Sequence, residues 1–216
     1  MNQVDINFLL SLIAVLPVIV GIIRYSNMNK NYLPFIWIFV FITISEVVRY
    51  ILINKAIYSH LPYNINYIIS SILYLILFYN WNKISKKFFL FLVTLTILVW
   101  SYIHFVISDI DTLTVPFRIY YSIMLIFLCL ITLSKELSKN IQETKVYKNS
   151  MIIICMVLIL YNTYRLILVP FVDTSSSYGF FVVLFGLNKY LLIASYLIFA
   201  LAVLWIPKKK NYSLQF

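Results

Sequence analysis

The chain has 216 residues, of which 63% are hydrophobic and only 11% are charged, and its mean hydropathy is +0.95. A water-soluble domain of this length cannot bury so much apolar surface, so the composition excludes that class and indicates a polytopic membrane protein. The net charge is +10. In a membrane protein such an excess arises from Lys and Arg in the cytoplasmic loops, so we expect no nucleic-acid partner.

Seven apolar segments are long enough to cross a bilayer, which needs about 20 residues. They cover residues 6–24, 33–54, 62–80, 88–108, 115–134, 149–171 and 180–206. We therefore predict an all-α membrane bundle of seven transmembrane helices that forms a single domain over residues 1–216. The last segment is longer than a bilayer requires. Either its helix tilts or projects outward, or Gly179–Gly186 is a separate interfacial element and the helix begins near Leu187.

The distribution of Lys and Arg between alternate loops predicts the orientation of the chain. Twelve of them lie in the first, third and fifth loops and the C-terminal tail: Arg24, Lys30, Lys83, Lys86, Lys87, Lys135, Lys139, Lys145, Lys148, Lys208, Lys209 and Lys210. The N-terminus and the other three loops hold only Lys55. We therefore expect the N-terminus outside and the C-terminus inside.

The segment "ISEVVRY", residues 44–50, places Glu46 and Arg49 inside a predicted membrane helix. Other ionisable residues in predicted helices are His104, Arg118, Arg165 and Lys189. Each such group costs about 2.5–3.5 kcal/mol in hydrocarbon, so it usually faces the bundle interior or a wet cavity. In the predicted orientation all of them fall in the outer halves of their helices, which indicates a cavity open to the outer side.

The spacing of the polar residues indicates which of them share a helix face. Glu46 and Arg49 are three residues apart, as are Asn162 and Arg165, and Tyr67 belongs to a helical repeat of Tyr63, Tyr67, Ser70 and Tyr74. The candidate ligand-binding residues are Glu46, Arg49, Tyr67, His104, Arg118, Asn162, Arg165 and Lys189. Cations exceed carboxylates in this set, and Arg binds carboxylate and phosphate groups well. We therefore expect an anionic small molecule or lipid headgroup as ligand.

Other interpretations of these residues remain open. Arg49 and Arg118 lie close to helix ends, so both could extend to the headgroups or form purely structural contacts. The chain could also act as a homo-oligomeric pore, or as an enzyme or transporter for a lipid phosphate, with Glu46 as the one deep carboxylate. No HExxH or G-x-S-x-G motif is present, so we predict no catalytic residue, metal or cofactor. Cys129 and Cys155 lie within apolar segments and are expected to be buried, reduced side chains.

Several stretches resemble a family of small seven-helix membrane proteins of Bacteroidetes-type bacteria. They are "LPVIVGIIRYSNMNKNYLPFIWIF", "PYNINYIISSILYLILFY", "VPFRIYYSIMLIFL" and "NKYLLIASYLIFALAVLWIPKKK". The resemblance implies the seven-span topology and a place in the bacterial inner membrane. Some small polytopic proteins of this kind look like accessory components of defence systems, including CRISPR loci, which is a further alternative. Our main hypothesis is different: a binding or sensor-like module with an outward-facing cationic pocket, which signals or docks to a cytoplasmic protein partner through the basic inner loops.

Overall fold

The computed structural model describes residues 3–57, 59–112, 114–140, 149–168 and 179–207, which form helices, turns and loops without a β-strand. This confirms the all-α class. The α-helices are α1 (Gln3–Ser11), α2 (Val15–Arg24), α3 (Leu33–Asn54), α4 (Leu61–Asn80), α5 (Lys86–Tyr102), α6 (Val115–Asn140), α7 (Ser150–Leu168) and α8 (Gly179–Leu204). Short 3₁₀ turns, η1 (Leu12–Ala14) and η2 (Lys30–Tyr32), precede α2 and α3, and the π-helical turn η3 (Ile103–Ile107) extends α5.

Six helical segments of the described chain are long and apolar enough to cross a membrane. They are Lys30–Asn54, Leu61–Asn80, Lys86–Ile107, Val115–Ser138, Ser150–Leu168 and Gly186–Leu204. Large apolar side chains also cover the outside of the bundle; for example, Ile23 is 73% exposed, Leu98 61% and Phe105 75%. An apolar exterior of this extent is compatible with lipid and not with water. The chain is therefore a multi-pass membrane protein.

The observed helices match the predicted segments closely, with differences at two places. The fifth predicted segment continues to Asn140. The last helix, α8, runs without a break from Gly179, which agrees with the predicted segment 180–206 and not with the alternative start near Leu187. The first predicted segment is divided by η1, which makes its apolar stretch, Phe8–Arg24, shorter than the six others. Pro17 explains the division, because it cannot donate to the carbonyl of Ile13 and its ring crowds that carbonyl.

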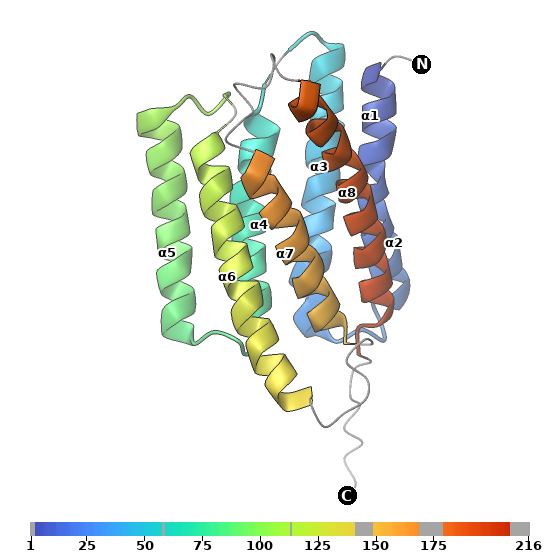
Figure 1. Cartoon of the computed structure of the whole chain (residues 1–216), viewed down its shortest axis with the longest axis vertical. Helices are drawn as coiled ribbons and strands as arrows, with labels where there is room; N and C mark the ends of the chain where they lie inside the picture. The colour runs from blue at the N-terminus through green and yellow to red at the C-terminus, as the bar shows by residue number, and fades with distance from the viewer. Residues whose placement is uncertain (1–2, 58, 113, 141–148, 169–178, 208–216) are drawn as a thin grey trace, which may run out of the picture.

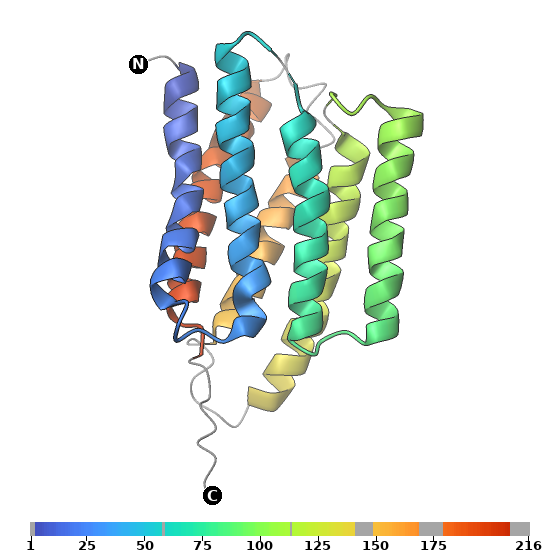
Figure 2. The ribbon, with the colours of Figure 1, turned by 180° about the vertical axis from the view of Figure 1, so that it is seen from behind.

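The helices form a ring with one helix outside it (Figures 1 and 2). Around the ring, α2 packs against α3, α3 against α4, α4 against α6, α6 against α7, α7 against α8, and α8 against α2. The outer helix, α5, packs mainly on α4. The start of α1 lies at one end of the bundle, here called the N-terminal end, and α8 ends at the opposite end (Figure 1). The helices of the ring can therefore enclose a site between them.

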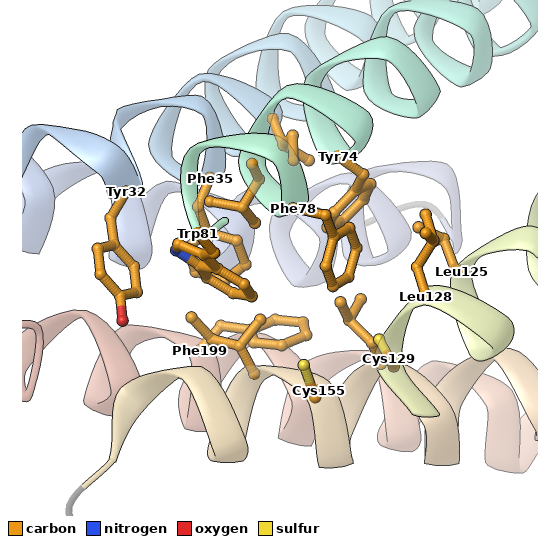
Figure 3. Packing of buried hydrophobic residues seen from close by; sticks show 14 of the residues in the cluster. Tyr32, Phe35, Tyr74, Phe78, Trp81, Leu125, Leu128, Cys129, Cys155 and Phe199 are labelled. Atoms are coloured by element: carbon orange, nitrogen blue, oxygen red, sulfur yellow. The ribbon is translucent and has the colours of Figure 1, made fainter. Parts of the chain in front are cut away.

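A tightly packed apolar core fills the half of the ring farther from the N-terminus. Phe35, Phe78, Leu125, Leu128 and Cys129 are almost completely buried there, and their side chains meet between the helices (Figure 3). Cys155 reaches the same core from α7. The expectation that Cys129 and Cys155 are buried, reduced side chains is confirmed. The core of this half is therefore apolar.

Polar contacts between loops and helix ends close the end of the bundle opposite the N-terminus. The ammonium group of Lys83 is paired with Glu136 of α6, and Lys135 donates to the carbonyl oxygen of Lys83 at 2.8 Å. Arg24, at the end of α2, donates to the carbonyl oxygens of Val203 and Leu204 at the end of α8. These bonds cap the last carbonyls of α8 and join the first and last helices of the ring.

Gly21 of α2 lies directly against Ile36 of α3, without room for a side chain. A Cβ atom built on Gly21 would lie 2.8 Å from Cδ1 and 3.0 Å from Cγ1 and Cγ2 of Ile36, a β-branched residue with few alternative rotamers. Small residues of this kind allow close helix packing in membranes. We predict that Gly21→Ala lowers the free energy of unfolding, measured in mixed micelles, by about 1–3 kcal/mol.

Two further variants test the cause of that loss. Ile36→Val, which removes the Cδ1 atom, should recover part of it in the Gly21→Ala background. Gly186→Ala is the matched control, because no atom lies within 4 Å of the added Cβ. Equal effects of Gly21→Ala and Gly186→Ala would contradict the packing explanation.

Candidate functional site

A polar cavity of about 260 Å³ lies between α3, α4, α6, α7 and α8 on the N-terminal side of the apolar core. Its polar lining residues are Glu46, Tyr63, Asn66, Tyr67, Ser70, Tyr74, Arg118, Tyr121, Tyr161, Asn162, Arg165, Ser195 and Tyr196. Its apolar lining residues are Phe39, Ile42, Leu158, Leu192 and Phe199. We call this space the main cavity.

The main cavity is charged at one level and apolar at another. On α3, Phe39 lies seven residues from Glu46, and on α7, Leu158 lies seven residues from Arg165, which is about 10 Å along a helix. The rings of Phe39 and Phe199 are 5.5 Å apart, and each also contacts Phe35. These rings form an aromatic floor that separates the main cavity from the core below.

Arg165 is the most deeply buried cation of the main cavity, with only 8% of its surface exposed. Its Nη2 atom donates to the hydroxyl oxygen of Tyr67 at 2.8 Å. Its guanidinium carbon also lies 5.2 Å from the ring centre of Tyr67 and 5.6 Å from that of Tyr161. Aromatic faces attract cations in this range, so tyrosines supply the partial negative charge that a buried arginine requires.

Tyr67 contacts two arginine side chains, Arg165 and Arg118. The guanidinium carbon of Arg118, from α6, lies 5.0 Å from the centre of the same ring. Among the described residues, no acceptor lies within hydrogen-bond distance of the buried Nε atom of Arg118. No carboxylate of the described chain lies within 4 Å of either Arg118 or Arg165. Two cations therefore meet at Tyr67 with capacity for an anionic partner.

Glu46 and Arg49 form the ion pair that their spacing indicates. Arg49 Nη2 lies 3.3 Å from Glu46 Oε2, and Tyr63 donates its hydroxyl proton to Glu46 Oε1 at 3.0 Å. Arg49 also lies over the ring of Tyr63, at 5.0 Å. The carboxylate is thus held by α3 and α4 together, and its charge is partly neutralised.

A second space of about 240 Å³, here called the side chamber, adjoins the main cavity. Its lining residues are Leu10, Ser11, Glu46, Arg49, Tyr63, Lys189, Leu192 and Ile193. Three of these, Glu46, Tyr63 and Leu192, also line the main cavity. The Glu46–Tyr63 pair therefore stands between the two spaces.

The positive charge of this region extends to His60, just before α4 at the N-terminal end. Partial burial, and then the positive charges of Arg118 and Arg49, lower the pKa of His60 from its ordinary value of 6.5. The neutral imidazole is therefore favoured beside these arginines.

The structure gathers seven of the eight sequence-predicted residues around the two spaces. Tyr67, Arg118, Asn162 and Arg165 line the main cavity, Arg49 and Lys189 line the side chamber, and Glu46 lines both. The helical repeat of Tyr63, Tyr67, Ser70 and Tyr74 on α4 also lines the main cavity. Asn162 donates to the carbonyl oxygen of Leu158, while no described donor bonds its buried Oδ1 atom.

His104 lies elsewhere. It is buried in η3, where Nδ1 is 2.9 Å from the carbonyl oxygen of Trp100 and Nε2 is 3.3 Å from Thr114 Oγ1. Thr114 in turn donates to Asn64, whose amide donates to two carbonyl oxygens of the α5–α6 connection. This network fastens that connection to α4. His104 therefore has a structural contact set, and it does not line either space.

Sequence reasoning missed three tyrosines of the main cavity: Tyr121, Tyr161 and Tyr196. Helical spacing from the predicted arginines identifies two of them, because Tyr121 is three residues after Arg118 and Tyr161 is four residues before Arg165. Tyr196 follows Lys189 by seven residues, which is two helical turns. A search for aromatic residues on the face of each intramembrane cation would have found all three.

The described residues contain no group of three or more His, Cys, Asp and Glu side chains that could hold a metal ion. Comparison of the chain with protein-family models, curated proteins and solved structures gives no match. The resemblance to small seven-helix proteins of Bacteroidetes-type bacteria therefore stays a prediction. The chemistry of the site must be argued from its own residues, which are suited to binding an anion.

We predict that Tyr67→Phe destabilises the protein, because it retains the ring but removes the acceptor of the buried Arg165 guanidinium. Hydrogen bonds to charged groups contribute about 1.5–3 kcal/mol in soluble proteins, and those in membrane interiors contribute less. We expect a loss of about 1–2 kcal/mol in the free energy of unfolding in mixed micelles. Tyr79→Phe on the same helix is the control, since the Tyr79 side chain is 36% exposed. Equal losses would contradict the role given to Tyr67.

Proposed function

We propose that the chain is a membrane binding module whose main cavity holds an anionic ligand. The observation that carries this proposal is the pair of arginines, Arg118 and Arg165, that share one tyrosine ring without a described carboxylate beside them. Buried guanidinium groups of structural ion pairs are matched by carboxylates. Here they are matched by tyrosines, which leaves most of their positive charge for a ligand.

The shape of the main cavity supports a ligand with an acidic head and a short apolar part. The head would lie at the level of Arg118 and Arg165, and the apolar part would extend about 10 Å toward the aromatic floor of Phe39 and Phe199. Tyrosine hydroxyl groups around the walls can donate to carboxylate or phosphate oxygens. Inorganic anions alone would leave the apolar half of the cavity unused.

We further propose the setting of this module as a seven-span protein of a bacterial inner membrane, with the N-terminus and the cavity facing outward. The positive-inside rule supports this orientation, since Arg24, Lys83, Lys86 and Lys135 lie at the end of the bundle opposite the N-terminus. That basic end would dock a cytoplasmic partner. Lys135 and Glu136 belong to α6, so a shift of α6 caused by the ligand would change their polar contacts with Lys83.

Two alternative functions have less support. Conduction through one chain would require a polar path across the bundle, whereas the aromatic floor and the apolar core lie below the main cavity. Hydrolysis of a lipid phosphate would require a general base, and Glu46 is held by Arg49 and Tyr63 in its pairing contacts. A pore formed by several copies at a shared axis would instead be expected to leave polar faces on the outside of the bundle.

Binding of hexyl phosphate to the purified full-length protein in detergent tests the proposal by isothermal titration calorimetry. We predict binding at least tenfold tighter than that of hexanol, which has the same chain without the charge. Arg165→Gln should weaken hexyl phosphate binding by about 10- to 100-fold, because it removes charge-assisted hydrogen bonds worth about 1.5–3 kcal/mol. Arg118→Gln should act in the same direction and avoids the deeper burial of Arg165.

Lys86→Gln is the control variant, since it removes one positive charge from an exposed position at the opposite end of the bundle. Its affinity for hexyl phosphate should stay within twofold of the unmodified protein. Equal affinities for hexyl phosphate and hexanol would contradict the proposal. So would a loss in the Lys86 variant as large as that in the two arginine variants.

A further inference from the structure

The side chamber lies beside α1, at the level where the first part of the chain no longer packs against α8. Below this level, η1 and α2 pack against α8, whereas α1 packs against α3. The break at η1, which Pro17 explains, separates α1 from α2. The chamber is lined by Leu10 and Ser11 on one side and by Lys189 and Ile193 of α8 on the other. It therefore lies between two helices at the outside of the ring.

The lining of the side chamber is amphipathic. Leu10, Leu192 and Ile193 supply apolar surface, while Arg49 and Lys189 supply positive charge. The Lys189 side chain is exposed, and that of Arg49 is 30% exposed. Among the described residues, no acceptor bonds the buried Nε atom of Arg49. Cations beside apolar side chains at this depth suit an acidic lipid headgroup followed by its chain.

The Glu46–Tyr63 pair, which stands between the side chamber and the main cavity, also allows an anion to pass. Glu46 would repel an approaching anion if its charge were unopposed. Arg49 pairs with its Oε2 atom at 3.3 Å, and Tyr63 donates to its Oε1 atom. Arg49 keeps this pair through Nη2, while its Nε atom, which has no partner among the described residues, can bind the headgroup on its way from Lys189 toward Arg118. A series of cations of this kind lowers the cost of moving an anion through an apolar wall.

We propose that the side chamber is a lateral entrance through which a single-chain anionic amphiphile moves from the bilayer into the main cavity. This inference rests on the proposed function, because it names the class of ligand and its route to the same site. The headgroup moves past Lys189 and Arg49 to Arg118 and Arg165. A chain longer than the distance to the aromatic floor stays in the side chamber and reaches the bilayer between α1 and α8.

The entrance is tested by comparing two alkyl phosphates on the full-length protein in lipid nanodiscs. Hexadecyl phosphate partitions into the bilayer and must enter from it, whereas hexyl phosphate reaches the cavity from water. In Ser11→Trp, a bulky ring is added to the wall of the side chamber. We predict that this variant slows association of hexadecyl phosphate at least tenfold, while its affinity for hexyl phosphate changes less than twofold.

Leu9→Trp is the matched control, because Leu9 is the neighbouring α1 residue but does not line the chamber, and its side chain is 52% exposed. It should leave the association of both phosphates unchanged. Ile193→Trp repeats the test from α8 and serves in place of Ser11→Trp if that variant does not fold.

The other outcomes separate the two proposals. If hexadecyl phosphate associates equally fast with the chamber variants and the unmodified protein, or if Leu9→Trp slows it as much, the lateral entrance is overturned. Binding of hexyl phosphate without any binding of hexadecyl phosphate overturns the entrance and leaves the proposed function standing. Absence of binding by both phosphates overturns the proposed function itself.

Discussion

The structure depends on how an apolar bundle holds Arg118 and Arg165, which have no carboxylate beside them among the described residues. The solution is a tyrosine, Tyr67, whose hydroxyl bonds Arg165 and whose ring lies beside both Arg165 and Arg118. Its ring also packs edge-on to Tyr121, at 5.6 Å. Dipoles and ring faces stabilise a cation only in part, unlike a full negative charge. The positive charge of the two guanidinium groups is therefore only partly balanced by the described residues, which is the basis of the proposed function.

The rest of the bundle can be understood as support for that arrangement. The packed core and the aromatic floor fill the lower half with apolar side chains, which hold the helices that carry the cations apart. The contacts between Arg24 and the end of α8, and between Lys83 and Glu136, close the same half.

Hydrophobic length and the spacing of polar residues predicted the helices and most of the polar side chains that line the two spaces. Seven of eight candidate residues lie at the two spaces because a charge in a membrane helix must face the interior, and helical spacing identifies its neighbours. His104 failed this reasoning because η3 turns it toward Thr114, a local contact that periodicity does not encode. The position of α5 outside the ring, and the separation of α1 from α8, also depend on tertiary packing that no single segment specifies.

The most direct test of the account is to locate a bound anion in an experimental structure. Crystals of the full-length protein grown with 6-bromohexyl phosphate would reveal the ligand by the anomalous scattering of bromine. The account predicts phosphate density between Arg118 and Arg165 and a bromine peak near Phe39 and Phe199. Arginine side chains turned toward the membrane surface, with neither phosphate density nor a bromine peak in the main cavity, would contradict it.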